Sequence, residues 1–300
     1  MPLSLLHYDV FTGEPLAGNQ LAVFPDARGL TADRMQALAC EMNFSESTFI
    51  LPPETPGTDA RMRIFTPAAE MPMAGHPTIG STFALAHTGV ISPGASRFVF
   101  GLGVGPVPVD LEWEDGRLRF AWMTQLNPTF GPALDARDGV AASIGLGAAD
   151  LVGNLPVQQV SCGVPFLIVP IGSREAVDRA LSDASAFRRL ATSTGIDLPI
   201  FLFALSPPGS SDTVYSRMFA PKFGIIEDPA TGSASGPLGC YLVRHRLISG
   251  DAAKRIISLQ GVAMGRPSRI HISIDERAGE IVEVKVGGQA VLVGRGELLV

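Results

Sequence analysis

Short hydrophobic runs separated by polar turns predict strands and helices in succession along the first part of the chain. An apolar run at residues 21–24 has the length and composition of a buried strand. Beyond it, one helical face carries the apolar residues Met35, Leu38, Ala39 and Met42. Thr31 offers the hydroxyl of a helix N-cap, Asn43 suits the left-handed conformation that ends a helix, and residues 48–51 form the next strand.

The second half of the chain repeats this order of elements. A helix with a polar face is predicted over about residues 185–194, Gly195 ends it, and an apolar strand follows at 200–203. Upstream, the segments GVP and LIV within 163–169 match GEP and LAV within 13–23. The two halves therefore have the same predicted succession of strand, helix and strand.

Two motifs also occur twice. RIFTP at residues 63–67 returns as RMFAP at 217–221, 154 positions later. EMPMAGH at 70–76 has its counterpart in EDPATGS at 227–233, 157 positions later, and one three-residue insertion accounts for the change in spacing. Repeated motifs within repeated elements predict an internal duplication.

Each half continues with a helix after the glycine of its second motif. Pro77 is expected at the first helical position, and the residues that follow include so few polar ones that the helix should be buried nearly all round. Gly89 ends this helix, and its counterpart is predicted over 237–247.

Segments of alternating hydrophobicity follow both helices and predict β-hairpins. They lie at 107–113 and 270–274, with turns at 114–116 and 277–279. The predicted fold class is α+β, with two duplicated domains, each a curved, mainly antiparallel sheet or barrel wrapped around a central apolar helix. The predicted domains are residues 1–126 and 127–300, with the last strand a candidate to return to the first domain.

The amino-acid composition excludes several classes of protein. The 300 residues are 46% hydrophobic and 17% charged, which excludes a disordered chain. Basic and acidic residues number 23 and 29, so the net charge of −6 argues against a nucleic-acid or anionic-membrane partner. No apolar run approaches the length of a membrane helix, and the first residues lack the pattern of a secretory signal.

Cysteine and histidine spacing gives no sign of a disulfide framework or a metal site. Cys40, Cys162 and Cys240 are far apart in sequence and form no C-x-x-C motif, which favours free thiols and a cytoplasmic location. None of the five histidines forms an H-x-x-x-H pair, so no metal is predicted.

The repeated motifs place two helix amino termini at equivalent positions, Gly75-His76 and Gly232-Ser233. Unpaired backbone N–H groups and the helix dipole bind anions at such ends. If duplication brings both ends to one cleft, they would hold a substrate carboxylate. The alternative is ordinary helix capping at each glycine.

Three side chains are candidates for proton chemistry. Glu46 directly precedes an apolar strand and shares a face with Thr48 and Ile50, so loss of solvation should raise its pKa toward a range useful for acid–base catalysis. His76 begins a helix, which should lower its pKa and favour the neutral ring. Asp228 lies just before the other helix. The alternatives are a glutamate that points into water, a structural histidine and, for Asp228, a solvated loop carboxylate or a partner for a backbone amide.

The motifs together resemble a known family. The segments are DVFT at 9–12, GN at 18–19, NFSE at 43–46, RIFTP at 63–67, AGHPT at 74–78, EDPATGSA at 227–234 and VGGQAV at 286–291. In this combination the chain resembles the PhzF-like (phenazine biosynthesis) isomerases, which have the diaminopimelate epimerase fold. The resemblance extends over nearly the whole chain.

The resemblance implies a cofactor-free isomerase that moves a proton within a small carboxylate-bearing, cyclic or amino-acid-like substrate, as in the isomerisation of trans-2,3-dihydro-3-hydroxyanthranilate. It implies Glu46 as the acid/base, with His76 and Asp228 assisting. The residues that it implies for substrate binding are Gly75, Gly232, Ser233, Ser45 and Asn19. A homodimer is usual in the family.

Racemases and epimerases of this fold use two cysteines, and the matching positions here are Ala74 and Thr231, neither of which can form a thiolate. A single carboxylate that returns the proton to the same face suits isomerisation better than inversion. Gln20, Met71 and Met73 differ from the family pattern and leave the substrate open. Two alternatives remain at this stage: a non-catalytic small-acid binding protein, and a hydrolase or racemase that uses Cys162.

Overall fold

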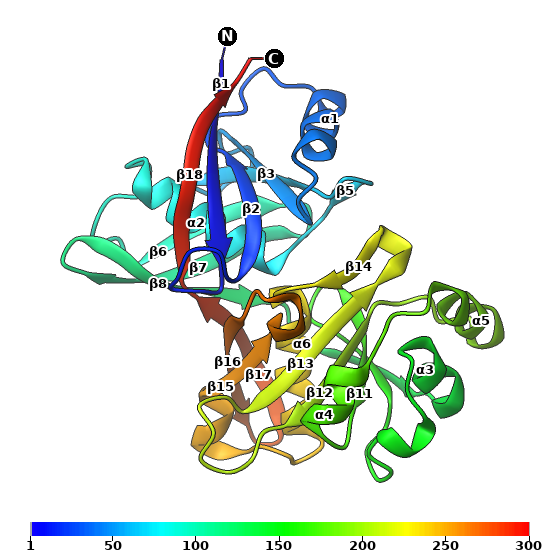
Figure 1. Ribbon diagram of the computed structural model, residues 1–300. Helices are drawn as coiled ribbons and strands as arrows, with labels where there is room; N and C mark the ends of the chain where they lie inside the picture. Colours follow the sequence, from blue (N-terminus) through cyan, green and yellow to red (C-terminus); the bar gives the residue numbers. More distant parts are fainter. Residues whose placement is uncertain (1, 300) are drawn as a thin grey trace. The chain divides into compact units, whose positions relative to one another are not determined.

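The computed structural model describes residues 2–299, which form a mixed fold of many strands and few helices (Figure 1). The predicted α+β class is confirmed. Contacts within the chain divide it into two compact units. Unit 1 runs from the amino terminus to Gln125 and resumes at Lys285, whereas unit 2 is Leu126–Val284. That these units are separate domains stays a prediction.

Unit 1 contains nine of the labelled strands and two of the helices. They are β1 (Leu3–Val10), β2 (Asn19–Phe24), β3 (Glu46–Leu51), β4 (Ala60–Phe65), β5 (Glu70–Met71), β6 (Arg97–Leu102), β7 (Gly105–Glu114), β8 (Arg117–Gln125), β18 (Ala290–Leu298), α1 (Ala32–Met42) and α2 (Gly75–His87).

Unit 2 contains the elements between them. They are β9 (Thr129–Ala133), β10 (Gln158–Ser161), β11 (Pro165–Pro170), β12 (Ile200–Leu205), β13 (Val214–Ala220), β14 (Ile225–Asp228), β15 (Ile256–Gln260), β16 (Ser268–Arg277), α3 (Arg137–Ser143), α4 (Arg174–Arg179), α5 (Ala184–Thr194) and α6 (Gly232–Arg244). β17 (Glu280–Gly288) begins in unit 2 and ends in unit 1.

The strands pair in the same succession in both units. In unit 1, β18, β1, β2, β3 and β4 pair in turn, and β4 then pairs with both β5 and β6, which is followed by β7. In unit 2, β9 to β13 pair in turn, and β13 then pairs with both β14 and β15, which is followed by β16. The parallel pairs β2–β3 and β4–β6 correspond to the parallel pairs β11–β12 and β13–β15. This agreement supports the predicted internal duplication.

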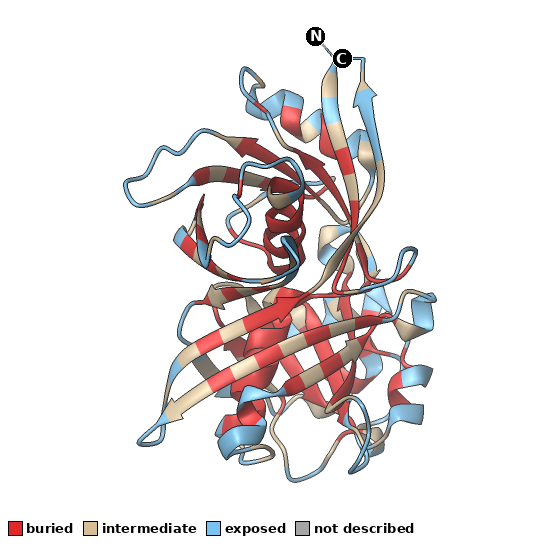
Figure 2. Cartoon of the chain, turned by 90° about the vertical axis from the view of Figure 1, so that its left-hand side faces the viewer, coloured by how far each residue is buried: buried red, intermediate tan, exposed pale blue. Residues whose placement is uncertain are grey.

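A buried helix packs against the strands of each unit, and Figure 2 shows both helices largely in the colour of buried residues. Every residue of α2 from Gly75 to Leu85 is buried, as predicted, and the helix contacts β1, β2, β3 and β8. Pro77 is its third residue rather than its first, which costs no hydrogen bond because the first four N–H groups of a helix have no intrahelical partner.

α6 is the corresponding helix of unit 2 and differs from the prediction in its bounds. It begins at Gly232 rather than at Pro237 and ends at Arg244 rather than at Leu247. Pro237 lies inside the helix, where it removes one backbone hydrogen bond. Burial of α6 against β10, β11 and β16 outweighs that loss, because packing supplies most of the stability of a helix in a protein.

Local signals placed the outer helices correctly. Thr31 caps α1 by accepting a hydrogen bond from the backbone N–H of Arg34, and Asn43 ends it with φ of 51°. Gly195 ends α5 with φ of 71°, and Asp183, which the sequence analysis did not identify, caps its start. β7 and β8 pair across the predicted turn at 114–116, and β16 and β17 flank the other predicted turn.

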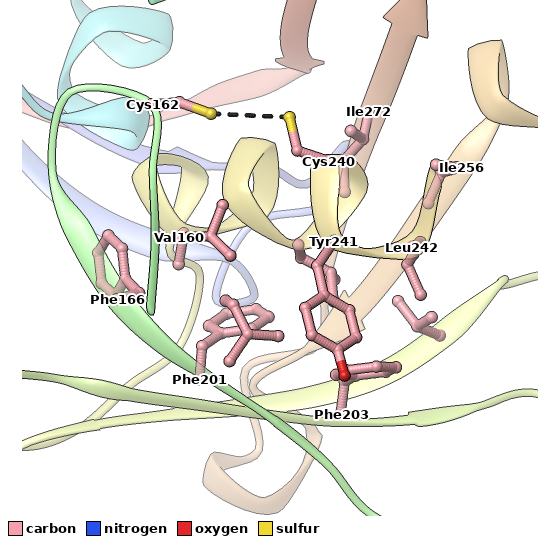
Figure 3. Packing of buried hydrophobic residues seen from close by; sticks show 14 of the residues in the cluster. Val160, Cys162, Phe166, Phe201, Phe203, Cys240, Tyr241, Leu242, Ile256 and Ile272 are labelled. Atoms are coloured by element: carbon pink, nitrogen blue, oxygen red, sulfur yellow. Dashed lines mark hydrogen bonds between the residues drawn. The ribbon is translucent and has the colours of Figure 1, made fainter. Parts of the chain in front are cut away.

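Two of the three cysteines meet in the core of unit 2 (Figure 3). The Sγ atoms of Cys162 and Cys240 are 3.7 Å apart, and both thiols are free. They lie among aromatic side chains that include Phe203 and Tyr241. Cys162 therefore has the surroundings of the buried structural thiol that the sequence analysis weighed against a catalytic one. No helix within residues 2–299 is long and apolar enough to cross a membrane.

Candidate active site

Strand β3 directs Glu46 toward the start of α2 within unit 1. Thr48, on the same strand face, has its hydroxyl 2.8 Å from that of Ser81 on α2, so this face of β3 points at the helix. Glu46 is the first residue of β3, and its Oε2 lies 3.2 Å from Nδ1 of His76, the second residue of α2. The Glu46 side chain is 15% exposed and that of His76 is 2% exposed.

Asn19 and Ser45 extend this contact into a connected group. Asn19 is the buried first residue of β2, and its Nδ2 lies 3.2 Å from the same Nδ1 of His76. The hydroxyl of Ser45 donates a hydrogen bond of 3.0 Å to Oδ1 of Asn19. Four residues that the sequence analysis proposed from three separate motifs are thus neighbours in unit 1.

Burial determines the charge of His76. It lowers the pKa of the imidazole to about 3, while hydrogen bonding to the backbone of Gln20 acts in the opposite direction. The predicted neutral ring is therefore found, with burial rather than the helix start as the main cause. Because the ring is neutral at neutral pH, its contact with Glu46 is a hydrogen bond and not an ion pair.

Nδ1 of His76 contacts both Glu46 and Asn19, and the proton of the neutral ring can lie on either ring nitrogen. With the proton on Nδ1, the ring donates to an ionised Glu46. With Nδ1 bare, its single lone pair accepts one hydrogen bond, either from a protonated Glu46 or from the amide of Asn19. The neutral ring can thus partner Glu46 in either of its protonation states, which is what an acid/base residue requires.

Asp228 in unit 2 is buried rather than solvated. It is the last residue of β14 and is 4% exposed. Its Oδ2 accepts a hydrogen bond of 2.5 Å from the hydroxyl of Thr231. The alternative of a solvated loop carboxylate is therefore wrong, whereas that of a partner for a backbone amide stays open.

Gln260 joins this group and was not found from the sequence. It ends β15, is fully buried, and donates from Nε2 to the carbonyl oxygen of Asp228 at 2.8 Å. One signal was available: Ile256, Ser258 and Gln260 occupy the buried phase of the alternation along β15. A glutamine in that phase needs polar partners inside the protein.

The two helix amino termini lack side-chain caps. Gly75 begins α2 and Gly232 begins α6, and the preceding residues, Ala74 and Thr231, make no capping hydrogen bond with their side chains. The Thr231 hydroxyl is directed to Asp228 instead. Both glycines begin their helices, as the alternative of ordinary helix starts also expects, and the anion site stays a prediction.

Ser233 follows Gly232 as the second residue of α6 and is half-buried. Among residues 2–299, no group of three or more His, Cys, Asp or Glu side chains is arranged to hold a metal ion.

Comparisons with known proteins agree with the resemblance. The chain is 39% identical over 293 residues to the trans-2,3-dihydro-3-hydroxyanthranilate isomerase of Pseudomonas aeruginosa, which covers 97% of this chain and 98% of that protein. It is 37% identical over 299 residues to an uncharacterized isomerase of Mesorhizobium japonicum, with 98% of each chain covered. The prediction of an isomerase is thereby confirmed.

Structural similarity extends over the same length. The crystal structure of the Bacillus anthracis phenazine biosynthesis protein of the PhzF family superposes with a TM-score of 0.88 at 28% identity and covers 100% of both chains. The PhzC-PhzF family model, described as phenazine biosynthesis-like protein, matches residues 8–296. With its motifs, fold and full-length relatives in agreement, this chain belongs to the PhzC-PhzF family of phenazine biosynthesis-like proteins.

Proposed function

We propose that this isomerase acts on trans-2,3-dihydro-3-hydroxyanthranilate or a closely related carboxylated ring, and that Glu46 carries the proton. The observation that carries the proposal is the contact of 3.2 Å between Glu46 and the neutral ring of His76. The relatives that bear this enzyme's name, 37–39% identical to the chain, supply the substrate class.

In the proposed reaction Glu46 removes a proton from one ring carbon and returns it to another carbon on the same face. His76 holds the carboxyl group in both protonation states, and Asn19, itself held by Ser45, holds His76. Asp228 orients the amino or hydroxyl group of the substrate. Backbone amides at Gly75, Gly232 and Ser233 bind the substrate carboxylate.

Replacing Glu46 by glutamine tests this role. Glu46→Gln keeps the shape of the side chain and removes its ability to take up a proton. We expect kcat to fall by about 10²–10⁴-fold, the usual contribution of general acid–base catalysis. Substrate binding should change little. Product formation and deuterium incorporation are followed by NMR in deuterated water.

Glu41→Gln is the matched control, because Glu41 lies at the exposed surface of α1. Full turnover by Glu46→Gln would refute the role of Glu46. Absence of turnover by the wild-type protein on a panel of carboxylated dihydroaromatic rings would refute the substrate class. A ligand that binds tightly without proton exchange would point to the non-catalytic alternative.

We also infer a homodimer in the cytoplasm. The family resemblance suggests the dimer, and the three free cysteines suit a reducing compartment.

A further inference from the structure

The end of β15 in unit 2 forms a closed hydrogen-bond network with the loop before α6. The amide of Gln260 donates from Nε2 to the carbonyl oxygen of Asp228 at 2.8 Å and to Oγ1 of Thr231 at 3.0 Å. Its Oε1 accepts the backbone N–H of Thr231 at 3.0 Å. The two backbone partners fix which end of the amide is the donor, and both N–H groups of the amide are used.

This network sets the direction of the next hydrogen bond. Because Oγ1 of Thr231 accepts from Gln260, the hydroxyl hydrogen is available for Oδ2 of Asp228, 2.5 Å away. Hydrogen bonds therefore run from Gln260 through Thr231 to Asp228. This hydrogen bond holds Oδ2 of the carboxylate and restrains the orientation of the group.

The duplicated unit identifies the residues that correspond to this network. In unit 1, β6 pairs with β4 at Arg61↔Gly101, and in unit 2, β15 pairs with β13 at Tyr215↔Leu259. Since Arg61 and Tyr215 each lie two residues before the arginine of the repeated motif, Gly101 corresponds to Leu259. The counterparts of Asp228, Thr231 and Gln260 are then Met71, Ala74 and Leu102.

The backbone approach is alike in both units. A Cβ at Gly103 would lie 2.9 Å from Cα of Pro72, and a Cβ at the corresponding Gly261 would lie 2.5 Å from the carbonyl oxygen of Pro229. Unit 1 thus brings the same strand end against the same turn with side chains that form no hydrogen bonds. The fold of the turn does not require the polar network of unit 2.

We propose that Gln260 is a positioning residue, which acts through Thr231 to orient the carboxylate of Asp228 toward the substrate. The proposal rests on the proposed function, in which Asp228 contacts the substrate. At the corresponding positions of unit 1 the same fold holds leucine and alanine, so the buried glutamine and threonine of unit 2 are not needed for the fold. We infer that they serve the reaction by orienting Asp228.

The test replaces Gln260 by the residue found at the corresponding position of unit 1. In Gln260→Leu we expect kcat to fall about 10-fold to 100-fold, because small displacements of a reacting or orienting group have effects of this size. KM should change by less than about threefold if the misoriented carboxylate acts mainly in the transition state. Thr231→Val should reproduce the loss, and Thr231→Ser, which keeps the hydroxyl, should restore kcat.

Gln158→Leu serves as the matched control. Gln158 also lies in a strand of unit 2 and donates to a backbone carbonyl, that of Gly131 at 2.8 Å, but it makes no hydrogen bond with Asp228 or Thr231. This variant should retain the wild-type kcat. Folded Gln260→Leu with wild-type kcat, or Thr231→Ser as impaired as Thr231→Val, would overturn the proposal.

A crystal structure of Gln260→Leu separates this inference from the proposed function. If the wild-type protein turns over no dihydroaromatic acid, the proposed function fails, and the position of Asp228 in the variant decides the inference. We expect the hydrogen bond between Thr231 and Asp228 to be lost and the carboxylate to rotate. An unchanged Asp228 carboxylate would overturn the positioning role whatever the activity.

Discussion

Replacing the arginine of the repeated motif should have very different effects in the two units. Arg63 pairs with Glu70 through Nε and Nη2 at 2.7 and 2.6 Å. Arg217 pairs with Glu227 in the same way, at 2.8 and 2.7 Å. Each guanidinium also lies over the phenylalanine two residues later, 5.1 Å from the ring centre in unit 1 and 5.0 Å in unit 2. These contacts account for the repeated R-x-F and glutamate positions.

The surroundings of the two pairs differ. The side chains of Arg63 and Glu70 are 16% and 42% exposed, whereas those of Arg217 and Glu227 are 6% and 13% exposed. Nη1 of Arg217 also donates to three carbonyl oxygens at the end of α4, those of Val177, Asp178 and Ala180. Burial opposes the charge of Arg217, yet the hydrogen bonds and the charge of Glu227 raise its pKa above the usual value.

These differences set the expected magnitudes. Arg217→Met leaves a largely buried carboxylate and three carbonyl groups without their donor, so the free energy of unfolding should fall by about 3–5 kcal/mol. Arg63→Met removes a pair whose carboxylate is solvated, and the fall should be no more than about 1 kcal/mol. The cation–π contact is lost in both variants and does not separate them.

Urea denaturation followed by circular dichroism measures both changes. Hydrogen exchange of the α4 amides assigns the larger one to unit 2. Adding Glu227→Gln to Arg217→Met should recover part of the loss, because it removes the unpaired charge. Equal losses for Arg63→Met and Arg217→Met, or no recovery in the double variant, would refute the reasoning.

Two further predictions concern the remaining functional and core groups. The buried His76 stays neutral in the folded protein down to its pKa of about 3, while in the unfolded chain it gains a proton near pH 6.5. The stability that this group contributes is thus complete above pH 6.5 and is lost as pH falls toward 3, by up to about 1.4 kcal/mol per pH unit. In urea titrations, the free energy of unfolding of His76→Gln should depend less steeply on pH than that of the wild type. Identical slopes against pH would contradict a neutral His76. Cys162→Ala should keep its isomerase activity, because the thiol lies in the core against Cys240, and loss of turnover in the folded variant would favour the cysteine-based alternative.

Predictions that rested on helix caps and left-handed residues agree with the structure. Thr31, Asn43 and Gly195 bound their helices because caps and left-handed residues act within one turn of the chain. The fold class followed from the repeated order of predicted strands and helices in the two halves of the chain. The contact between Glu46 and His76 also agrees with the strand-face argument, since Thr48 places that face against α2.

What the sequence analysis missed depends on contacts between distant segments. Gln260 is 29 residues from Thr231 along the chain, and only the pairing of β15 with β13 brings the two together. The start of α6 was misplaced because Pro237 looks like a first helical residue, and the burial that overrides this signal comes from strands elsewhere in unit 2. The contact between Cys162 and Cys240 could not be predicted, because two cysteines so far apart in sequence form no recognisable motif.

The duplicated scaffold carries different polar groups in its two copies. Phe49 pairs with Arg63 and Leu202 pairs with Arg217, so Glu46 corresponds to Pro199 in unit 2. His76 corresponds to Ser233. Unit 2 therefore lacks the carboxylate–imidazole contact of unit 1.

Unit 1 in turn lacks the hydrogen-bond network around Asp228, because Asp228, Thr231 and Gln260 have only apolar counterparts there. A racemase with one thiolate from each copy needs the same chemistry twice, and Ala74 and Thr231 provide it in neither copy. An isomerisation needs one group that moves a proton and others that hold the substrate. The proposed function thus assigns proton transfer to residues of one copy, Glu46 and His76, and contact with the substrate's polar group to a residue of the other, Asp228.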